Sequence, residues 1–167
     1  MSASTQLDHT GSLNGSDHNA ERIQEIVVQR HRSLLQYADL RWPWGELQDC
    51  AERNILKTMA ARQREGIRKL VLLLDRRGWA VDYGQFSDHF KDFTFVAVDH
   101  LWQQVVKSEH DLLAELHEVR QDVIEDDDAV KVLDQCIAHQ REILTTVSEH
   151  VVESRSHANQ RNSERRV

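Results

Sequence analysis

The 167-residue sequence contains one proline and six glycines, which leaves few positions suited to ending a helix. It has no run approaching about 18 apolar residues, as a membrane-spanning helix would need, and no basic region followed by an apolar stretch at its start. With 40% hydrophobic and 29% charged residues, the composition is ordinary for a soluble globular protein. These absences predict one domain of long helices, in the cytoplasm and not bound to a membrane.

Cysteine is also scarce. Cys50 and Cys136 are the only two, and they fall in separate apolar-patterned segments. They therefore indicate reduced core thiols rather than the disulfide framework of a secreted protein. The formal net charge of -7 repels nucleic acid and anionic membrane surfaces, so neither is expected as a partner.

Composition divides the chain into three parts. Residues 1–19 are rich in Ser, Thr, Gly, Asn and Asp and are expected to be a disordered tail, because they have too little apolar surface to offset the entropy of ordering. Residues 154–167 are expected to form a basic C-terminal tail. Between them, apolar residues at three- and four-residue steps predict a four-helix bundle over residues 20–153.

The periodicity predicts helices over residues 20–40, 43–77, 94–123 and 129–152, with Gly78 as a left-handed cap after the second. The connection over residues 79–95 decides the topology. If Ser87 caps the third helix, the loop is short and the second and third helices are antiparallel. If Asp92 caps it, about fourteen extended residues at roughly 3.3 Å each can run the length of the bundle, which makes these helices parallel. We favour Asp92, because the long aromatic connection then has a hydrophobic groove to lie in.

Each predicted helix has a polar residue in the middle of its apolar stripe, where an aliphatic side chain is expected. These residues are His31, Gln63, Ser108 and Gln140.

Four long helices, a long crossover between the second and third, and polar residues within the apolar stripes resemble the ferritin-like superfamily, the bundle shared by bacterioferritin and rubrerythrin. The resemblance covers residues 20–152. It implies a site for two iron or manganese ions between the helices, used for iron oxidation, peroxide reduction or oxygen chemistry. In that family two helices each supply a Glu, and the other two each supply a Glu-x-x-His pair.

This sequence departs from the family's ligand pattern. None of its ten histidines has an acidic residue three positions before it. Aligned with the family pattern without gaps, the pair on the second helix falls at Gln63 and Gly66, and the pair on the fourth helix at Gln140 and Ile143. Glutamine is a weak neutral ligand, and glycine and isoleucine side chains are not ligands. The sequence therefore predicts the bundle without a standard di-iron centre and without a cofactor.

Three interpretations of the polar residues stay open. They can be hydrogen-bonded core groups that fix the helix register, or they can line a ligand pocket. Alternatively, a metal site survives with altered ligands: Glu52, on the buried face of the second helix, or Glu109 and Glu115, at the edge of the third stripe. The first two describe a binding or structural module. The third describes an iron- or manganese-dependent oxidoreductase or iron-handling protein, so the sequence leaves open whether the chain is an enzyme.

The third predicted helix also suggests self-association. Trp102, Val106 and Leu113 lie off its buried stripe and are expected to face water in a monomer. We therefore expect a homodimer. No motif names a substrate or another partner.

Overall fold

The computed structural model describes residues 15–41 and 50–164, which are almost entirely helical and contain no strand. The elements are α1 (Gly15–His31), α2 (Leu34–Leu40), α3 (Cys50–Arg76), the 3₁₀ helix η2 (Asp88–Phe95), α4 (Val98–Asp122) and α5 (Asp127–Glu164). The predicted all-α class is confirmed. Across these two ranges we find no helix with the length and apolar character needed to cross a bilayer.

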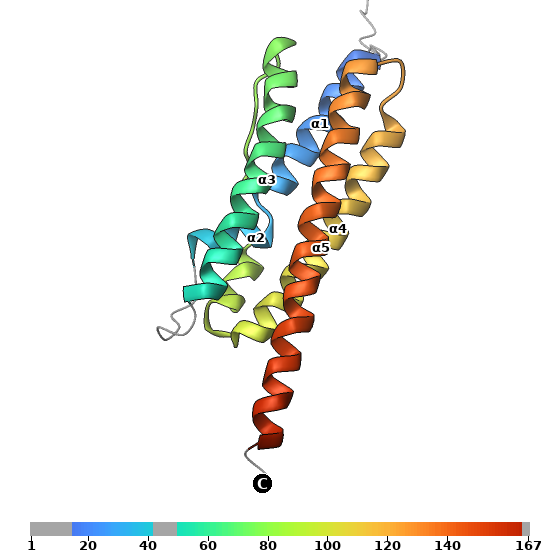
Figure 1. Ribbon diagram of the computed structural model, residues 1–167. Coiled ribbons are helices and arrows are strands. Elements are labelled where there is room, and N and C mark those ends of the chain that lie inside the picture. Colours follow the sequence, from blue (N-terminus) through green and yellow to red (C-terminus); the bar gives the residue numbers. More distant parts are fainter. Residues whose placement is uncertain (1–14, 42–49, 165–167) are drawn as a thin grey trace, which may run out of the picture.

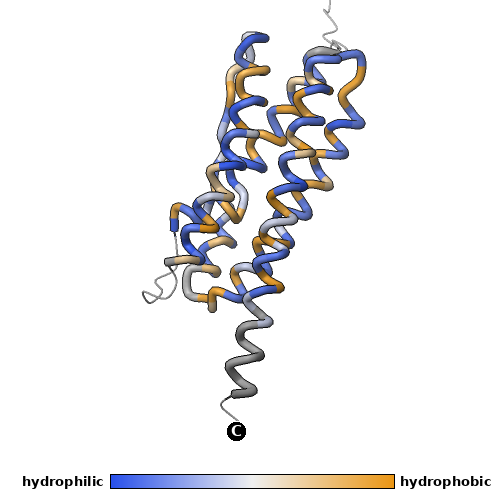
Figure 2. Tube along the Cα trace, viewed as in Figure 1, coloured by the Kyte–Doolittle hydropathy of each residue, from blue (hydrophilic) through white to orange (hydrophobic). Residues whose placement is uncertain are grey.

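The long helices lie side by side along one axis (Figure 1). α1 packs on α3 and α4, and α5 packs on the same two helices from another side, while α2 continues the contacts of α1 with α3 and α4. α1 and α5 run in one direction, and α3 and α4 run in the other. Hydrophobic and hydrophilic residues alternate along each helix (Figure 2), as expected when one face of the helix is buried and the other is exposed.

Residues 79–87 return along the molecule from the end of α3, so α4 runs in the same direction as α3 (Figure 1). This segment packs on α1. Arg32 Nε donates hydrogen bonds to the carbonyl groups of Tyr83 at 2.7 Å and Gly84 at 2.9 Å. Gly84 has a φ of +58°, and a Cβ there would lie 2.6 Å from the Val28 side chain. Glycine therefore allows the returning segment to approach α1 closely.

The capping residues differ in part from the expectation. Gly78 has a φ of 75°, and the N–H of the following Trp79 bonds back to Leu74, so the predicted left-handed end of α3 is confirmed. The prediction that Asp92 caps the third long helix is wrong, because Asp92 lies inside η2. α4 instead begins after Ala97, which makes no side-chain cap.

Several boundaries also differ. The first predicted helix is not continuous over residues 20–40, because α1 and α2 are separate. α1 begins at Gly15, inside the segment expected to be disordered, and α5 continues to Glu164, through most of the expected basic tail. Residues 1–14, 42–49 and 165–167, which include the predicted start of the second helix, lie outside the described residues.

The apolar core has two parts. The first core joins α1, the second half of α3, the second half of α4 and the first half of α5, and includes Ile23, Val27, Leu70, Leu74, Leu116, Leu133 and Cys136. The second core joins α2, the first half of α3, the first half of α4 and the middle of α5, and includes Leu35, Leu56, Leu101, Trp102, Ile143 and Val147. Burying each large aliphatic side chain contributes about 1.5–3 kcal/mol, so both cores stabilise the fold substantially.

The expectation that Trp102 faces water is wrong. It is 1% exposed and belongs to the second core. Val106 and Leu113 are half-buried against the second and first cores, respectively. The apolar surface from which we predicted the homodimer is therefore largely buried within one chain.

Candidate functional site

A layer of buried polar side chains separates the two cores. On α3 the second core ends at Ala60 and the first core begins at Ile67. On α5 the first core ends at Ile137 and the second core begins at Ile143. We call the buried polar residues between these limits, together with their neighbours on α1, α2 and α4, the polar layer. Its members are Arg30, Ser33, Gln36, Gln63, Glu109 and Gln140.

The break between α1 and α2 lies in this layer. Ser33 has extended backbone angles, and its Oγ accepts a hydrogen bond from the Gln36 N–H at 3.3 Å, which makes it the N-cap of α2. Ser-x-x-Gln is the spacing of a capping box, a signal that the sequence analysis missed because apolar periodicity continues across the break. The Gln36 side chain does not bond back to Ser33 in the usual way but reaches into the layer.

A backbone carbonyl fixes the direction of the hydrogen bonds. Gln36 Nε2 donates to the Ala60 carbonyl at 2.9 Å and to Gln63 Oε1 at 2.8 Å. Because a carbonyl can only accept, the Gln36 amide must present its nitrogen there, and Gln63 must present its oxygen to Gln36. Ser33 Oγ also donates to Gln63 Oε1 at 2.8 Å. The Gln63 amide nitrogen is thereby turned toward Glu109 and donates to its Oε2 at 2.8 Å.

Gln140 approaches the same carboxyl group from α5. Its Nε2 donates to Glu109 Oε2 at 2.7 Å and to the Glu109 backbone carbonyl at 3.1 Å, so this amide is also oriented by a backbone acceptor. One carboxyl oxygen thus receives two amide donors. Burial raises the pKa of Glu109 to about 7, although the hydrogen bonds from Gln140 and Gln63 and the charge of Arg30 act in the opposite direction.

Arg30 lies next to this carboxyl group and is fully buried. Its guanidinium group rests against α3 at Gly66, where a Cβ would lie 2.8 Å from Nη2. None of its three side-chain nitrogens has a hydrogen-bond partner, and neither do Glu109 Oε1 and Gln140 Oε1. Burial lowers the pKa of Arg30, opposed by Cys136 and Glu109. Buried polar atoms normally have partners, so these five atoms are exceptional.

The structure brings together two of the four residues predicted from the apolar stripes. Gln63 and Gln140 both belong to the polar layer, where both bond to Glu109. His31 does not join them. It is half-buried at the end of α1, its ring lies 4.7 Å from that of Tyr83, and burial, together with the charges of Arg32 and Arg64, lowers its pKa.

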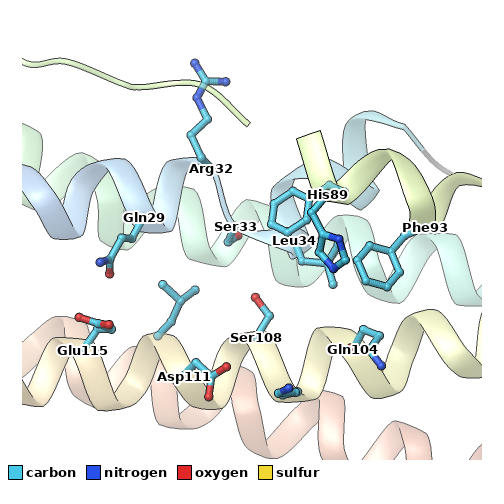
Figure 3. Close-up of a pocket in the computed structure, with 13 residues that line it drawn as sticks. Gln29, Arg32, Ser33, Leu34, His89, Phe93, Gln104, Ser108, Asp111 and Glu115 are labelled. Atoms are coloured by element: carbon cyan, nitrogen blue, oxygen red, sulfur yellow. The ribbon is translucent and has the colours of Figure 1, made fainter. Parts of the chain in front are cut away.

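Ser108 lines a groove between α1, α2 and α4 (Figure 3). The groove has a volume of about 410 Å³, and Ser33 lies across it from Ser108. Glu115 and Gln29 lie toward one end, and the rings of Phe90 and Phe93 lie toward the other. Ser33 also bonds to Gln63, so the groove lies beside the polar layer.

The acidic residues considered as alternative metal ligands are dispersed. Glu52 Oε2 lies beside the second core, where it accepts a hydrogen bond from Trp102 Nε1 at 2.7 Å and contacts His150 Nε2. Glu109 is in the polar layer, and Glu115 lines the groove. Over residues 15–41 and 50–164, the structure brings no three His, Cys, Asp or Glu side chains together as a possible metal site.

No protein family, curated protein or solved structure matches this chain.

The polar layer has two chemical capacities that follow from its own residues. Glu109, with a pKa near 7, can gain or lose a proton at neutral pH. Arg30 presents a buried cationic fork without an acceptor, which suits an anion.

Sequence reasoning missed Arg30 because an arginine within an amphipathic helix is ordinarily assigned to its solvated face. A signal was nevertheless present. Gly66 interrupts a long helix that contains no other glycine, and an isolated glycine of this kind often allows another group to approach the backbone closely.

Proposed function

We propose that the chain is a ferritin-like four-helix bundle without a di-metal centre, and that it functions as a binding module for a small polar ligand. One observation carries this proposal: Gln63 and Gln140, at the positions aligned with the family's ligands, both direct amide N–H groups to Glu109 Oε2. An amide N–H group cannot ligate a metal ion, so both glutamines present donors where the family pattern places ligands.

The donor set does not suit two dications. Iron(II) and manganese(II) are best bound where several anionic oxygens or imidazoles converge, and this layer supplies one carboxyl group. For Gln63 to offer its oxygen instead, its amide would have to rotate and place its nitrogen against Gln36 Nε2 and Ser33 Oγ. Gln36 could not compensate, because the Ala60 carbonyl holds its nitrogen in place.

Buried polar atoms are normally satisfied by protein groups or by ordered water. Here the Arg30 nitrogens, Glu109 Oε1 and Gln140 Oε1 have no protein partner. The helix break at Ser33 borders a surface groove lined by Ser33 itself, which bonds to Gln63 of the layer. The combination supports a binding role for the layer.

Metal analysis tests the proposal. Protein purified without chelator should contain far less than one iron or manganese ion per chain, and added iron(II) or manganese(II) should not raise its unfolding temperature. About two ions per chain, lost together when Glu109→Ala is introduced, would show instead that the chain is a metal-dependent oxidoreductase or iron-handling protein with unusual ligands.

We further propose that the protein is a cytoplasmic homodimer. With Trp102 buried, support for self-association comes from α5, which runs past the ends of the other helices (Figure 1) and exposes 64% of Val152. A helix that projects alone gains little from tertiary packing, so a second copy would stabilise it.

A further inference from the structure

We propose that the polar layer binds a small oxyanion that retains a proton, with Arg30 donating to its charged oxygens and with Glu109 Oε1 and Gln140 Oε1 accepting from its hydroxyl group. Hydrogen phosphate is the simplest member of this class. The inference rests on the proposed binding function and specifies its ligand.

The charge around Arg30 calls for an anion. A guanidinium group has five N–H donors and no acceptor, and here no acceptor is within hydrogen-bonding distance. Burial raises the pKa of the Cys136 thiol and lowers the pKa of His139, which keeps both groups neutral. Lys69 adds positive charge near both of them. Among the described residues, Glu109 is the one carboxyl group that acts on Arg30, and burial raises the pKa of Glu109 to about 7.

Gly66 indicates that the position of the guanidinium group is specific. Glycine weakens the middle of a helix relative to alanine, and Gly66 lies well inside α3. The absence of a side chain lets Arg30 Nη2 rest on the helix backbone, since an added Cβ would be 2.8 Å away. Cys136 Sγ, from α5, donates to the Gly66 carbonyl at 3.6 Å, so α5 packs on α3 at the same glycine.

The two unpartnered oxygens require a hydrogen-bond donor, so the anion must carry a proton. Glu109 Oε2 is occupied by two amide donors, but Glu109 Oε1 and Gln140 Oε1 are free acceptors beside it. An anion with oxygen acceptors alone, such as sulfate, would satisfy Arg30 but would repel the ionised Glu109. Hydrogen phosphate can donate its hydroxyl proton to these oxygens and accept from Arg30 at the same time.

Calorimetric titration of the full chain at pH 8 and constant ionic strength tests this discrimination. Inorganic phosphate is expected to bind at one site per chain, and sulfate is expected to bind at least tenfold more weakly, because one charge-assisted hydrogen bond becomes a repulsion. Equal binding of the two anions would overturn the inference. Absence of binding would also overturn it, and would mean that water satisfies Arg30.

Variants assign the binding to the layer. Arg30→Met should weaken phosphate binding about tenfold or more, whereas Arg62→Met, on the exposed face of α3, should leave it unchanged. Glu109→Gln provides a second test should Arg30→Met fail to fold. Its amide can donate a hydrogen bond, so sulfate should now bind about as well as phosphate. Retained discrimination in Glu109→Gln would contradict the proposed role of Glu109.

Failure of this inference can be separated from failure of the proposed function. Protein that contains no stoichiometric metal but binds no phosphate would refute the oxyanion ligand alone. Two metal ions per chain would refute the proposed function itself, whatever the titration shows.

Discussion

Gln63 of α3 donates a hydrogen bond to Glu109 of α4 across the centre of the molecule, at 2.8 Å between Nε2 and Oε2. The two helices each pack on α1 and α5. This bond therefore links them through the interior, at the level where neither core contributes apolar contacts.

The first prediction concerns that bond. Gln63→Met keeps the approximate size of the side chain but leaves Ser33 Oγ, Gln36 Nε2 and Glu109 Oε2 each short of one partner. We expect the free energy of unfolding to fall by about 2–4 kcal/mol, since each buried group left unpaired costs about 1–3 kcal/mol and partial relaxation offsets some of the loss. Urea denaturation measures the change. Gln103→Met, exposed on α4, is the matched control and should change stability by less than about 0.5 kcal/mol.

The second prediction is a dependence of stability on pH. The pKa of Glu109 is about 7 in the folded chain, compared with an ordinary value of 4.5, so between these values the folded state holds a proton that the unfolded state has released. Stability should therefore fall as pH rises through this window and level off above it, a difference of about 3 kcal/mol from this one group.

Glu109→Gln removes that contribution. Between pH 4.5 and pH 8, the free energy of unfolding should fall by about 3 kcal/mol less in Glu109→Gln than in the wild type. All other titrating groups are shared by the two proteins and cancel. Parallel stability curves for the two proteins would contradict the raised pKa.

The third prediction concerns the helix break. Ser33→Ala removes both the N-cap of α2 and the donor to Gln63, and should destabilise the chain by about 1–3 kcal/mol. Ser33→Thr keeps a hydroxyl group and should lose less than half as much. Equal losses in the two variants would show that packing at this position matters more than the hydroxyl group.

The fourth prediction couples Gly66 to Arg30. An alanine in place of a mid-helix glycine ordinarily stabilises a helix by about 1 kcal/mol, but here its Cβ displaces a buried guanidinium group. Gly66→Ala should therefore destabilise the wild type and stabilise the Arg30→Met variant. Chemical denaturation of the four proteins of this double-mutant cycle measures the coupling, and simple additivity would place Arg30 elsewhere.

The fifth prediction is the homodimer. Light scattering at working concentration should give the mass of two chains. Val152→Glu should shift the equilibrium toward the monomer. The control is Leu72→Glu, because Leu72 is exposed on α3. A single-chain mass for the wild type would exclude the dimer.

Much of the fold was predictable because apolar periodicity reports directly which face of a helix is buried. It predicts long helices near α1, α3, α4 and α5 and the buried positions of Gln63 and Gln140, and Gly78 marks the end of α3. Periodicity could not reveal the break at Ser33, since Leu34 and Leu35 continue the stripe of α1. Periodicity also predicts an exposed Trp102, which is wrong. The ring is buried because a large side chain can reach apolar neighbours from the flank of a helix.

The site was only partly predictable. Gln63 and Gln140 were found because they interrupt apolar stripes. Glu109 was assigned to a stripe edge, and its role as the acceptor of both amides depends on how α3, α4 and α5 meet. Burial of Arg30 likewise depends on Gly66, which is 36 positions away in the sequence. Such pairings are set by tertiary contacts: Gly66 indicates a close approach, but nothing near it in the sequence names Arg30 as the group that approaches.

The division of the apolar interior has a consequence for how the protein unfolds. Each end of the molecule has its own hydrophobic cluster, and buried polar residues, among them Arg30, Gln63, Glu109 and Gln140, lie between the two clusters. Loss of order at one end need not spread to the other, because polar side chains rather than apolar contacts form the junction between the two clusters. Filling the junction would join both ends into one cooperative unit, which amide hydrogen exchange would register as matched protection along α3 and α5.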